Sequence, residues 1–217
     1  MIYFFEEMDK MTAEDIDKLE WCFPWNDNET NYIFKNKKER VLAYALFMLG
    51  IKEEFNICEK VHLVKNNYGK PMIQNGMFEF NISHTETGVA CAIDNEPIGI
   101  DIQQWIDYTS GLEKYVFSIV EKQKFYIYEN KKYMFTRIWA IKESYGKFLG
   151  IGNGFGMTEK SFLDFDKTFF KYDALFFRVL DTPNNVLSIC SKKPMELIKL
   201  NKNQILDIVG SRNHYFK

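Results

Sequence analysis

Apolar side chains recur at helical spacing in two long stretches of this chain. From residue 37 to 49 they fall three or four positions apart, which predicts a helix with these apolar residues at helical spacing: Val41, Leu42, Ala45, Leu46 and Leu49. Gly50 follows and is a plausible cap just beyond the helix end.

The second helical pattern covers residues 137–149. At about 100° per residue, one side collects the apolar residues Met134, Ile138, Ile141, Tyr145, Phe148 and Leu149. Glu143 and Lys147 fall roughly opposite, one turn apart, together with Trp139. Because an exposed helix face rarely carries Trp, we expect other parts of the protein, or a ligand, to cover the Glu143 side.

Shorter patterns predict strands and turns elsewhere. A strand opens the chain at residues 2–5, and Thr12 with Asp15 resembles a capping box that starts a short helix. A further helix is expected near 121–129, and a β-hairpin from 88–93 and 98–102, joined by a polar turn. Further strands are expected at 61–64, 78–80, 169–172, 175–180, 186–190 and 197–200.

The fold class is therefore α+β, in two halves with boundaries at 1–104 and 105–217. Each half offers a helix and several strands, so a pseudo-duplicated pair is conceivable, although no sequence repeat is visible. The 217 residues suffice for a substantial core, and 46% of them are hydrophobic.

Charge and cysteine content narrow the function classes. The net charge of −2 argues against broad nucleic-acid binding, which needs a basic face. The four cysteines form no Cys-x-x-Cys pair, so a zinc site is not expected. No apolar stretch is long enough to cross a bilayer. With no signal peptide recognised, these features predict a cytoplasmic protein.

Asp101 is the first candidate for chemistry. It lies in the predicted strand 98–102, where alternation places Asp101 and Gln103 on one face and the isoleucines on the other. That face is either a solvent-exposed polar edge or part of a metal site, since Mg²⁺ is held by one or two carboxylates plus substrate phosphates. Likewise, Glu143 and Lys147 are either an exposed ion pair or part of that site.

Three further segments could bind phosphate, although each has a structural explanation taken alone. His84 follows the predicted strand 78–80 in Asn81-Ile-Ser-His84, and Lys70 lies in the loop Tyr68-Gly-Lys70-Pro71. Arg40 lies in a basic patch at the start of a helix, where phosphates are readily bound. The glycine-rich run 150–156 fits no phosphate-loop pattern and is expected to be a helix stop and turn.

Taken together, four segments resemble the motifs of the 4′-phosphopantetheinyl transferases of the larger, surfactin-synthetase-activating type. They occur in the family's order and are Tyr68-Gly-Lys-Pro71, Phe80-Asn-Ile-Ser-His-Thr85, Ile98-Gly-Ile-Asp-Ile102 and Trp139-Ala-Ile-Lys-Glu-Ser-Tyr-Gly-Lys147. Each motif is short, but four in order are specific. Arg40 before Val-Leu-Ala-Tyr also resembles the family's early Arg-helix segment.

The resemblance implies a reaction and a fold. Coenzyme A donates its 4′-phosphopantetheine arm to a serine of an apo acyl or peptidyl carrier protein, with Mg²⁺, and adenosine 3′,5′-bisphosphate leaves. The fold implied is two similar α+β halves, each a helix on a small, mostly antiparallel sheet, related by pseudo-twofold symmetry, with the coenzyme between them. A built-in second half indicates a monomer.

The resemblance also implies the roles of individual residues. Asp101 and Glu143 would hold Mg²⁺, Glu143 would be the base for the carrier serine, and Lys147 would contact the pyrophosphate and offset the leaving-group charge. The coenzyme phosphates would be bound by Arg40, Lys70, Ser83, His84 and Lys147. Glu121 matches a further acidic position of the family and is a candidate to assist.

One position departs from the family pattern: Gln103 stands where a Glu is frequent. Either water fills that metal position, or the Gln103 amide oxygen binds Mg²⁺ more weakly than a carboxylate does.

Two other functions stay open: another Mg²⁺-dependent phosphoryl or nucleotidyl transferase, and an inactive, carrier-binding relative. The apolar residues of 104–120 are either a carrier-docking surface or ordinary core.

Overall fold

The computed structural model describes residues 1–23, 37–59 and 61–210. Contacts divide the chain into two compact units, each assembled from separated segments. Unit 1 comprises Met1–Lys65, Pro71–Asn95 and Met195–Lys217, and unit 2 comprises Asn66–Lys70 and Glu96–Pro194. This division differs from a single boundary after residue 104, because the strand 98–104 groups with unit 2 and the C-terminal segment with unit 1.

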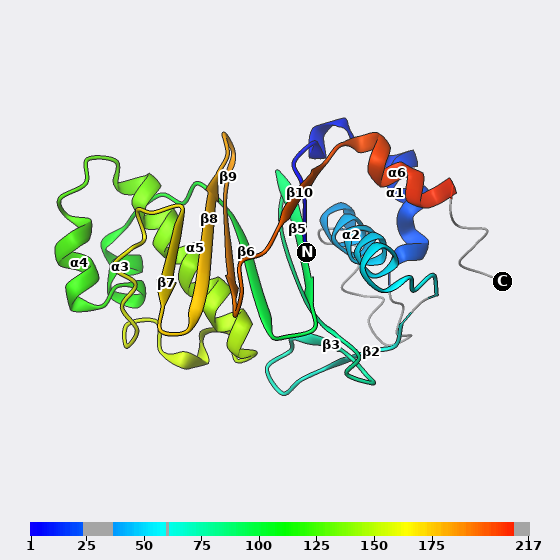
Figure 1. Cartoon of the computed structure of the whole chain (residues 1–217). Coiled ribbons are helices and arrows are strands. Elements are labelled where there is room, and N and C mark those ends of the chain that lie inside the picture. The colour runs from blue at the N-terminus through cyan, green and yellow to red at the C-terminus, as the bar shows by residue number, and fades with distance from the viewer. Residues whose placement is uncertain (24–36, 60, 211–217) are drawn as a thin grey trace. The chain divides into compact units, whose positions relative to one another are not determined.

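Unit 1 is a four-stranded sheet covered by helices (Figure 1). The strand order is β10-β1-β5-β4, in which only the β1–β10 pair is parallel. The strands are β1 (Ile2–Phe5), β4 (Glu79–Thr85), β5 (Gly88–Asp94) and β10 (Leu197–Leu200). The helices are α1 (Ala13–Leu19), α2 (Lys37–Phe55) and α6 (Lys202–Gly210), and a small ribbon is formed by β2 (Leu63–Lys65) and β3 (Pro71–Ile73).

The predicted helix is confirmed as α2, which packs on β5 and β4. Residues 41–48 are all buried, so over these two turns the helix is enclosed on every side. It does not end at Gly50, so the predicted cap there is wrong; the helix runs five residues further. A Cβ at position 50 would stand 2.3 Å from the Ile93 Cδ1 atom and 2.9 Å from the Tyr3 ring. Gly50 therefore permits a close approach of helix and sheet, which outweighs its cost within a helix.

Unit 2 is an antiparallel four-stranded sheet with the order β6-β9-β8-β7. Its strands are β6 (Ile98–Gln104), β7 (Phe169–Tyr172), β8 (Leu175–Asp181) and β9 (Asn185–Ser191). Its helices are α3 (Ser110–Val116), α4 (Ile119–Phe125) and α5 (Lys131–Leu149), with a 3-10 turn, η4, at Gly152–Phe155. The longest helix, α5, lies across β6 and β9 and buries most of its length (Figure 1).

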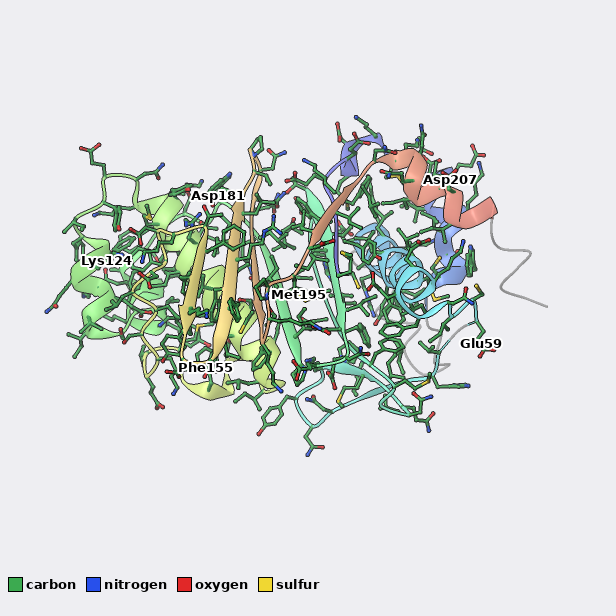
Figure 2. The ribbon with its side chains drawn as sticks, viewed as in Figure 1. Glu59, Lys124, Phe155, Asp181, Met195 and Asp207 are labelled. Atoms are coloured by element: carbon green, nitrogen blue, oxygen red, sulfur yellow. The ribbon has the colours of Figure 1, made fainter. Side chains whose placement is uncertain are left out.

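Aromatic rings fill the core of unit 2. Tyr145 of α5 meets Phe162 and Phe177 edge-on or tilted, with ring centroids 5.3 Å and 6.5 Å away. Phe155 of η4, which is labelled in Figure 2, stands edge-on to the same tyrosine, with the two ring centroids 5.2 Å apart. Such pairs contribute about 0.5–1.5 kcal/mol beyond their area. The contact between Phe155 and Tyr145 thereby packs the η4 turn against the C-terminal part of α5.

Most predicted elements are confirmed. The capping box of α1 is present, since the Thr12 hydroxyl accepts from the Asp15 N–H and the Asp15 carboxylate accepts from the Thr12 N–H. Gly150 ends α5 in the left-handed conformation, with φ of 73°. The confirmed strands are those at residues 2–5, 169–172, 175–180, 186–190 and 197–200.

Three further predictions about elements differ from the structure in pairing or in bounds. The strands 88–93 and 98–102 exist but form no hairpin, because β5 pairs with β1 and β4, whereas β6 pairs with β9. His84 does not follow a strand but lies inside β4, which starts at Glu79 and continues to Thr85. The helix expected near 121–129 is present as α4, but it begins earlier, at Ile119 after a Ser118 cap, and ends at Phe125.

The fold class is mixed α+β, as predicted, with two main sheets and helices packed on them. Within the described residues, no helix is long and apolar enough to cross a membrane.

Candidate active site

Asp101 lies on β6 under α5. It is 2% exposed, so the alternative of a solvent-facing polar edge is excluded. Strand alternation puts Gly99, Asp101 and Gln103 on one face, and this face meets α5, because a Cβ on Gly99 would collide with the Ser144 carbonyl oxygen. Asp101 is therefore a buried carboxylate on the face of β6 that packs against α5.

Lys147, in the last turn of α5, supplies the charge opposite Asp101. Its Nζ donates to the Asp101 Oδ1 over 2.7 Å, and the Gln103 Nε2 donates to the other carboxylate oxygen over 2.8 Å. The Lys147 side chain keeps a quarter of its surface exposed. The ion pair thus connects a buried carboxylate to a partly accessible ammonium.

Glu143 completes the group, one turn before Lys147 on α5. Burial raises the pKa of the Glu143 carboxyl, and the negative charge of Asp101 raises it further. A hydrogen bond with Asn153 and the charge of Lys147 oppose that rise. The two carboxylates therefore repel each other across a site that contains one ammonium.

The donor set fits a hard divalent cation. The carboxylates of Asp101 and Glu143 and the amide of Gln103 offer oxygen ligands, and the single ammonium of Lys147 balances only one of the two negative charges. Mg²⁺ is typically held by one or two carboxylates together with waters and substrate phosphates. In the described part of the chain, no group of three or more His, Cys, Asp or Glu side chains is arranged so that it could hold a metal ion.

Lys70 also reaches this region. Its Nζ donates to the Lys147 carbonyl oxygen over 3.0 Å and to the Ile98 carbonyl oxygen over 3.4 Å. These are backbone groups of the two elements that carry Lys147 and Asp101. Unit 2 therefore brings together five of the predicted site residues: Lys70, Asp101, Gln103, Glu143 and Lys147.

The other three predicted phosphate ligands belong to unit 1. Arg40 lies on α2, with its guanidinium 5.0 Å from the centroid of the Phe23 ring. Ser83 and His84 are neighbours on β4, opposite Ala90 and Val89 of β5. Ser83 is buried and His84 half-buried. Their role toward a ligand stays a prediction.

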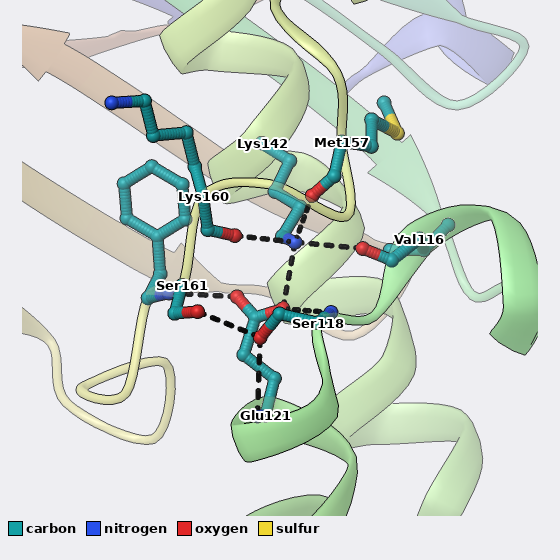
Figure 3. A network of polar contacts seen from close by, with 8 residues as sticks. Val116, Ser118, Glu121, Lys142, Met157, Lys160 and Ser161 are labelled. Atoms are coloured by element: carbon teal, nitrogen blue, oxygen red, sulfur yellow. Dashed lines mark hydrogen bonds and ion pairs between the residues drawn. The ribbon is translucent and has the colours of Figure 1, made fainter.

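Glu121 and Lys142 form a fully buried ion pair (Figure 3). The Lys142 Nζ lies 2.7 Å from the Glu121 Oε2 and also donates to the carbonyl oxygens of Val116, Met157 and Lys160. The other Glu121 oxygen accepts the Phe162 N–H over 2.7 Å. The pair joins α4, α5 and the loop 157–162.

Sequence reasoning missed Lys142. It lies four residues after Ile138 and three before Tyr145, on the stripe that builds the core. A charged residue on such a stripe needs a buried partner, which is a signal that could have drawn attention to Glu121. Burial lowers the pKa of Lys142, and the Glu121 charge opposes this. Both side chains of the pair have no exposed surface.

Parts of this chain are similar to known proteins. Residues 97–192 match the family model of the 4′-phosphopantetheinyl transferase superfamily. The 4′-phosphopantetheinyl transferase gsp of Aneurinibacillus migulanus is 37% identical over 118 residues, 52% of this chain and 46% of that protein. A 4′-phosphopantetheinyl transferase of Bacillus subtilis is 36% identical over 113 residues, 51% of this chain and 46% of that protein.

A more distant relative is the L-aminoadipate-semialdehyde dehydrogenase-phosphopantetheinyl transferase of Candida glabrata, 30% identical over 129 residues, which are 54% of this chain and 50% of that protein. The chain spans about half the length of the curated relatives it matches. The predicted resemblance to the 4′-phosphopantetheinyl transferase superfamily is confirmed, and the matched region 97–192 carries Asp101, Glu143 and Lys147.

Proposed function

We propose that this protein is a 4′-phosphopantetheinyl transferase. It takes coenzyme A and an apo acyl or peptidyl carrier protein, and moves the phosphopantetheine arm to a carrier serine. One observation carries the proposal: Asp101, Glu143 and Lys147 meet at one point of unit 2, inside the region that matches the family.

In the proposed reaction, the serine oxygen bonds to the pyrophosphate phosphorus that carries the pantetheine arm. The bond from this phosphorus to the bridging oxygen breaks, and adenosine 3′,5′-bisphosphate leaves with that oxygen. Glu143 accepts the serine proton, a role that its raised pKa favours. Lys147, drawn from Asp101 to the substrate, offsets the charge that develops on the leaving group.

Asp101 and Glu143 would hold Mg²⁺, with Gln103 as a neutral third donor. When bound, the ion would neutralise the charge of the pyrophosphate oxygens. Arg40, Lys70, Ser83 and His84 would bind the coenzyme phosphates, by the resemblance of their motifs.

Further parts of the proposal concern the whole protein. The two units would be repeats of one arrangement related by pseudo-twofold symmetry. In support, each contains a 19-residue helix on a four-stranded sheet: α2 in one and α5 in the other. We also propose that the protein acts as a cytoplasmic monomer. The carrier it serves is a peptidyl or acyl carrier, without a choice between them.

Two alternative functions predict different results in an activity assay. Another Mg²⁺-dependent phosphoryl or nucleotidyl transferase would consume a nucleoside triphosphate in place of coenzyme A. An inactive, carrier-binding relative would show no turnover; Gln103 favours this reading, and the assembled Asp101, Glu143 and Lys147 oppose it.

The test is the intact mass of an apo carrier after incubation with the protein, coenzyme A and Mg²⁺. We expect a gain of about 340 Da, the mass of the transferred arm. The Asp101→Ala variant should give no gain, whereas Asp164→Ala, which removes a partly exposed aspartate outside the segment 104–120, should match the wild type. No gain with several carriers, but turnover of a nucleoside triphosphate, would favour the nucleotide transferase.

A further inference from the structure

The loop Asn66–Lys70, between β2 and β3, belongs by its contacts to unit 2. Asn66 organises it. The Asn66 Oδ1 accepts the backbone N–H groups of Tyr68 and Lys70, each over 2.9 Å, and the Asn66 N–H donates to the Lys70 carbonyl oxygen over 3.0 Å. One side chain thus closes the whole loop on itself.

The same side chain fastens the loop to α5. The Asn66 Nδ2 donates to the carbonyl oxygen of Gly150, the residue that ends α5, over 2.6 Å. The last carbonyl groups of a helix lack partners within the helix and carry its negative end. The loop therefore supplies donors where the helix needs them.

Lys70 makes the second connection to the same helix end. Its ammonium donates to the carbonyl oxygen of Lys147, whose own side chain holds Asp101. The contact with the Ile98 carbonyl oxygen extends this bridge to β6. Any shift of the loop along α5 would move Lys70 relative to the Lys147–Asp101 pair.

We propose that Asn66 is a positioning residue of the active site, which sets the place of Lys70 by anchoring its loop to the C-terminal end of α5. The proposal rests on the proposed function, in which Lys70 binds a coenzyme phosphate. Neither the Gly-Lys-Pro motif nor the family resemblance assigned a role to Asn66.

The chemistry of the position favours asparagine. The site uses a carbonyl acceptor and an N–H donor on one short, planar side chain, which only an amide provides. Aspartate keeps the acceptor for Tyr68 and Lys70 but loses the donor to Gly150. The Asn66→Asp variant therefore removes the hydrogen bond to the Gly150 carbonyl oxygen and keeps the two hydrogen bonds within the loop.

Asn67 is the matched control. It is exposed on the same loop, so Asn67→Asp introduces the same charge one residue further on, without touching the connection to α5.

The first measurement needs no substrate. Tyr68 is 67% exposed and lies in the fastened loop, so chymotrypsin cleavage after Tyr68 reports loop opening. A lost hydrogen bond of ordinary strength should speed this cleavage about 3- to 10-fold in Asn66→Asp. Asn67→Asp should cleave at the wild-type rate. Equal cleavage rates for the wild type and Asn66→Asp would contradict the claim that Asn66 anchors the loop to α5.

The second measurement tests the link to Lys70 by calorimetric binding of coenzyme A. We expect Asn66→Asp to weaken coenzyme binding about 3- to 10-fold in the wild-type background. In the Lys70→Met background it should weaken binding by less than about twofold, since coupled residues are not additive. Equal weakening in both backgrounds would overturn the positioning role.

The two measurements separate this inference from the proposed function. A wild-type protein that binds no coenzyme would overturn the proposed function and the positioning of Lys70 for it. The cleavage rates would still decide whether Asn66 fastens the loop to α5.

Discussion

Gly99 of β6 lies directly against the backbone of α5 at Ser144. A Cβ on Gly99 would stand 1.9 Å from the Ser144 carbonyl oxygen and 2.4 Å from the Phe148 nitrogen. Ser144 also exchanges a hydrogen bond with Ser188 of β9, with 2.9 Å between their hydroxyl oxygens. The glycine of the Gly-Ile-Asp motif thus lets the helix approach closely enough for Lys147 to reach Asp101.

Gly99→Ala should therefore destabilise unit 2 strongly. Overpacking against side chains costs about 1–3 kcal/mol, and here the obstacle is backbone, which cannot rotate away, so we expect at least the upper end of this range. Urea unfolding measures the effect. Gly111→Ala is the matched control: it adds a methyl group in α3 with only the Thr109 hydroxyl nearby, 4.0 Å away. Equal stability of Gly99→Ala and Gly111→Ala would contradict the close approach.

The Glu121–Lys142 pair predicts a coupled loss of stability. Lys142→Met leaves the Glu121 charge buried without its partner, which costs about 3–5 kcal/mol. The double variant Glu121→Gln, Lys142→Met should lose less than the sum of the two single variants, because no lone charge remains. Urea unfolding of all four proteins gives the coupling energy.

An exposed ion pair in the same unit provides the comparison. Lys192 lies 3.2 Å from Glu96, with nearly half of each side chain in solvent, so Lys192→Met should cost less than about 1 kcal/mol. Additive effects in the Glu121 and Lys142 variants would argue against a joined network.

Glu113 predicts a pH dependence of stability. Burial opposes its charge, but hydrogen bonds from Lys122, Tyr108 and Tyr126 hold the pKa of Glu113 at about 2, below its ordinary value of 4.5. Since the folded-state pKa is lower, the stabilisation is complete above pH 4.5 and is lost as the pH falls toward 2. Urea unfolding between pH 6 and 3 should show this decline.

Removing the carboxylate should flatten that decline. Glu113→Gln is expected to be less stable than the wild type at pH 6 and to lose less stability on acidification. Glu129→Gln, which changes an exposed carboxylate, should keep the wild-type slope. An unchanged slope in Glu113→Gln would assign the acid sensitivity to other groups.

Local patterns predicted the strands and both long helices well, because their signals lie in neighbouring residues. The alternation around Asp101 and the spacing of Glu143 and Lys147 on one helix were readable in the same way. The resemblance to the family's ordered motifs then indicated that Asp101 belongs to the same site as Glu143 and Lys147. Lys70 could be linked to these residues only through the family resemblance, since its contacts with α5 cross 77 positions.

Long-range pairing was not readable. The turn residues 94–97 favour a hairpin, yet β5 already has β1 and β4 as neighbours on its two edges, so β6 pairs elsewhere. Gly50 carries the signal of a helix cap, but its role depends on how closely Ile93 approaches. In both positions, tertiary packing decided between two locally acceptable conformations.

Gln103 predicts a change in metal dependence. It lies on the face of β6 that carries Asp101, and its amide donates to that carboxylate. Gln103→Glu supplies a charged oxygen ligand there, so the Mg²⁺ concentration for half-maximal transfer should fall several-fold, perceptible in a Mg²⁺ titration of carrier modification. Gln104→Glu adds the same charge on the opposite face of the strand and should titrate like the wild type. An unchanged titration in Gln103→Glu would show that residue 103 does not face the metal.

The segment 104–120 predicts where a carrier docks. Phe117 is buried in the core of unit 2, and Trp105 and Tyr108 pack against it, so core packing explains these three aromatic residues. Tyr115 is half-exposed, and Ile119, four residues further along the chain at the start of α4, is 81% exposed. An aromatic residue so placed suits an apolar contact with a carrier helix, so Tyr115→Ala should raise the KM for the carrier about tenfold, at unchanged coenzyme affinity.

Phe169 provides the matched control for this docking surface. It is an exposed aromatic residue of the same unit, on the edge strand β7, well separated in sequence from α3. Phe169→Ala should leave the KM for the carrier unchanged, because it removes the same kind of side chain elsewhere. If Tyr115→Ala raised the KM for carrier and weakened coenzyme binding equally, the effect would come from a disturbed active site. If both alanine variants behaved like the wild type, α3 would not be the docking surface.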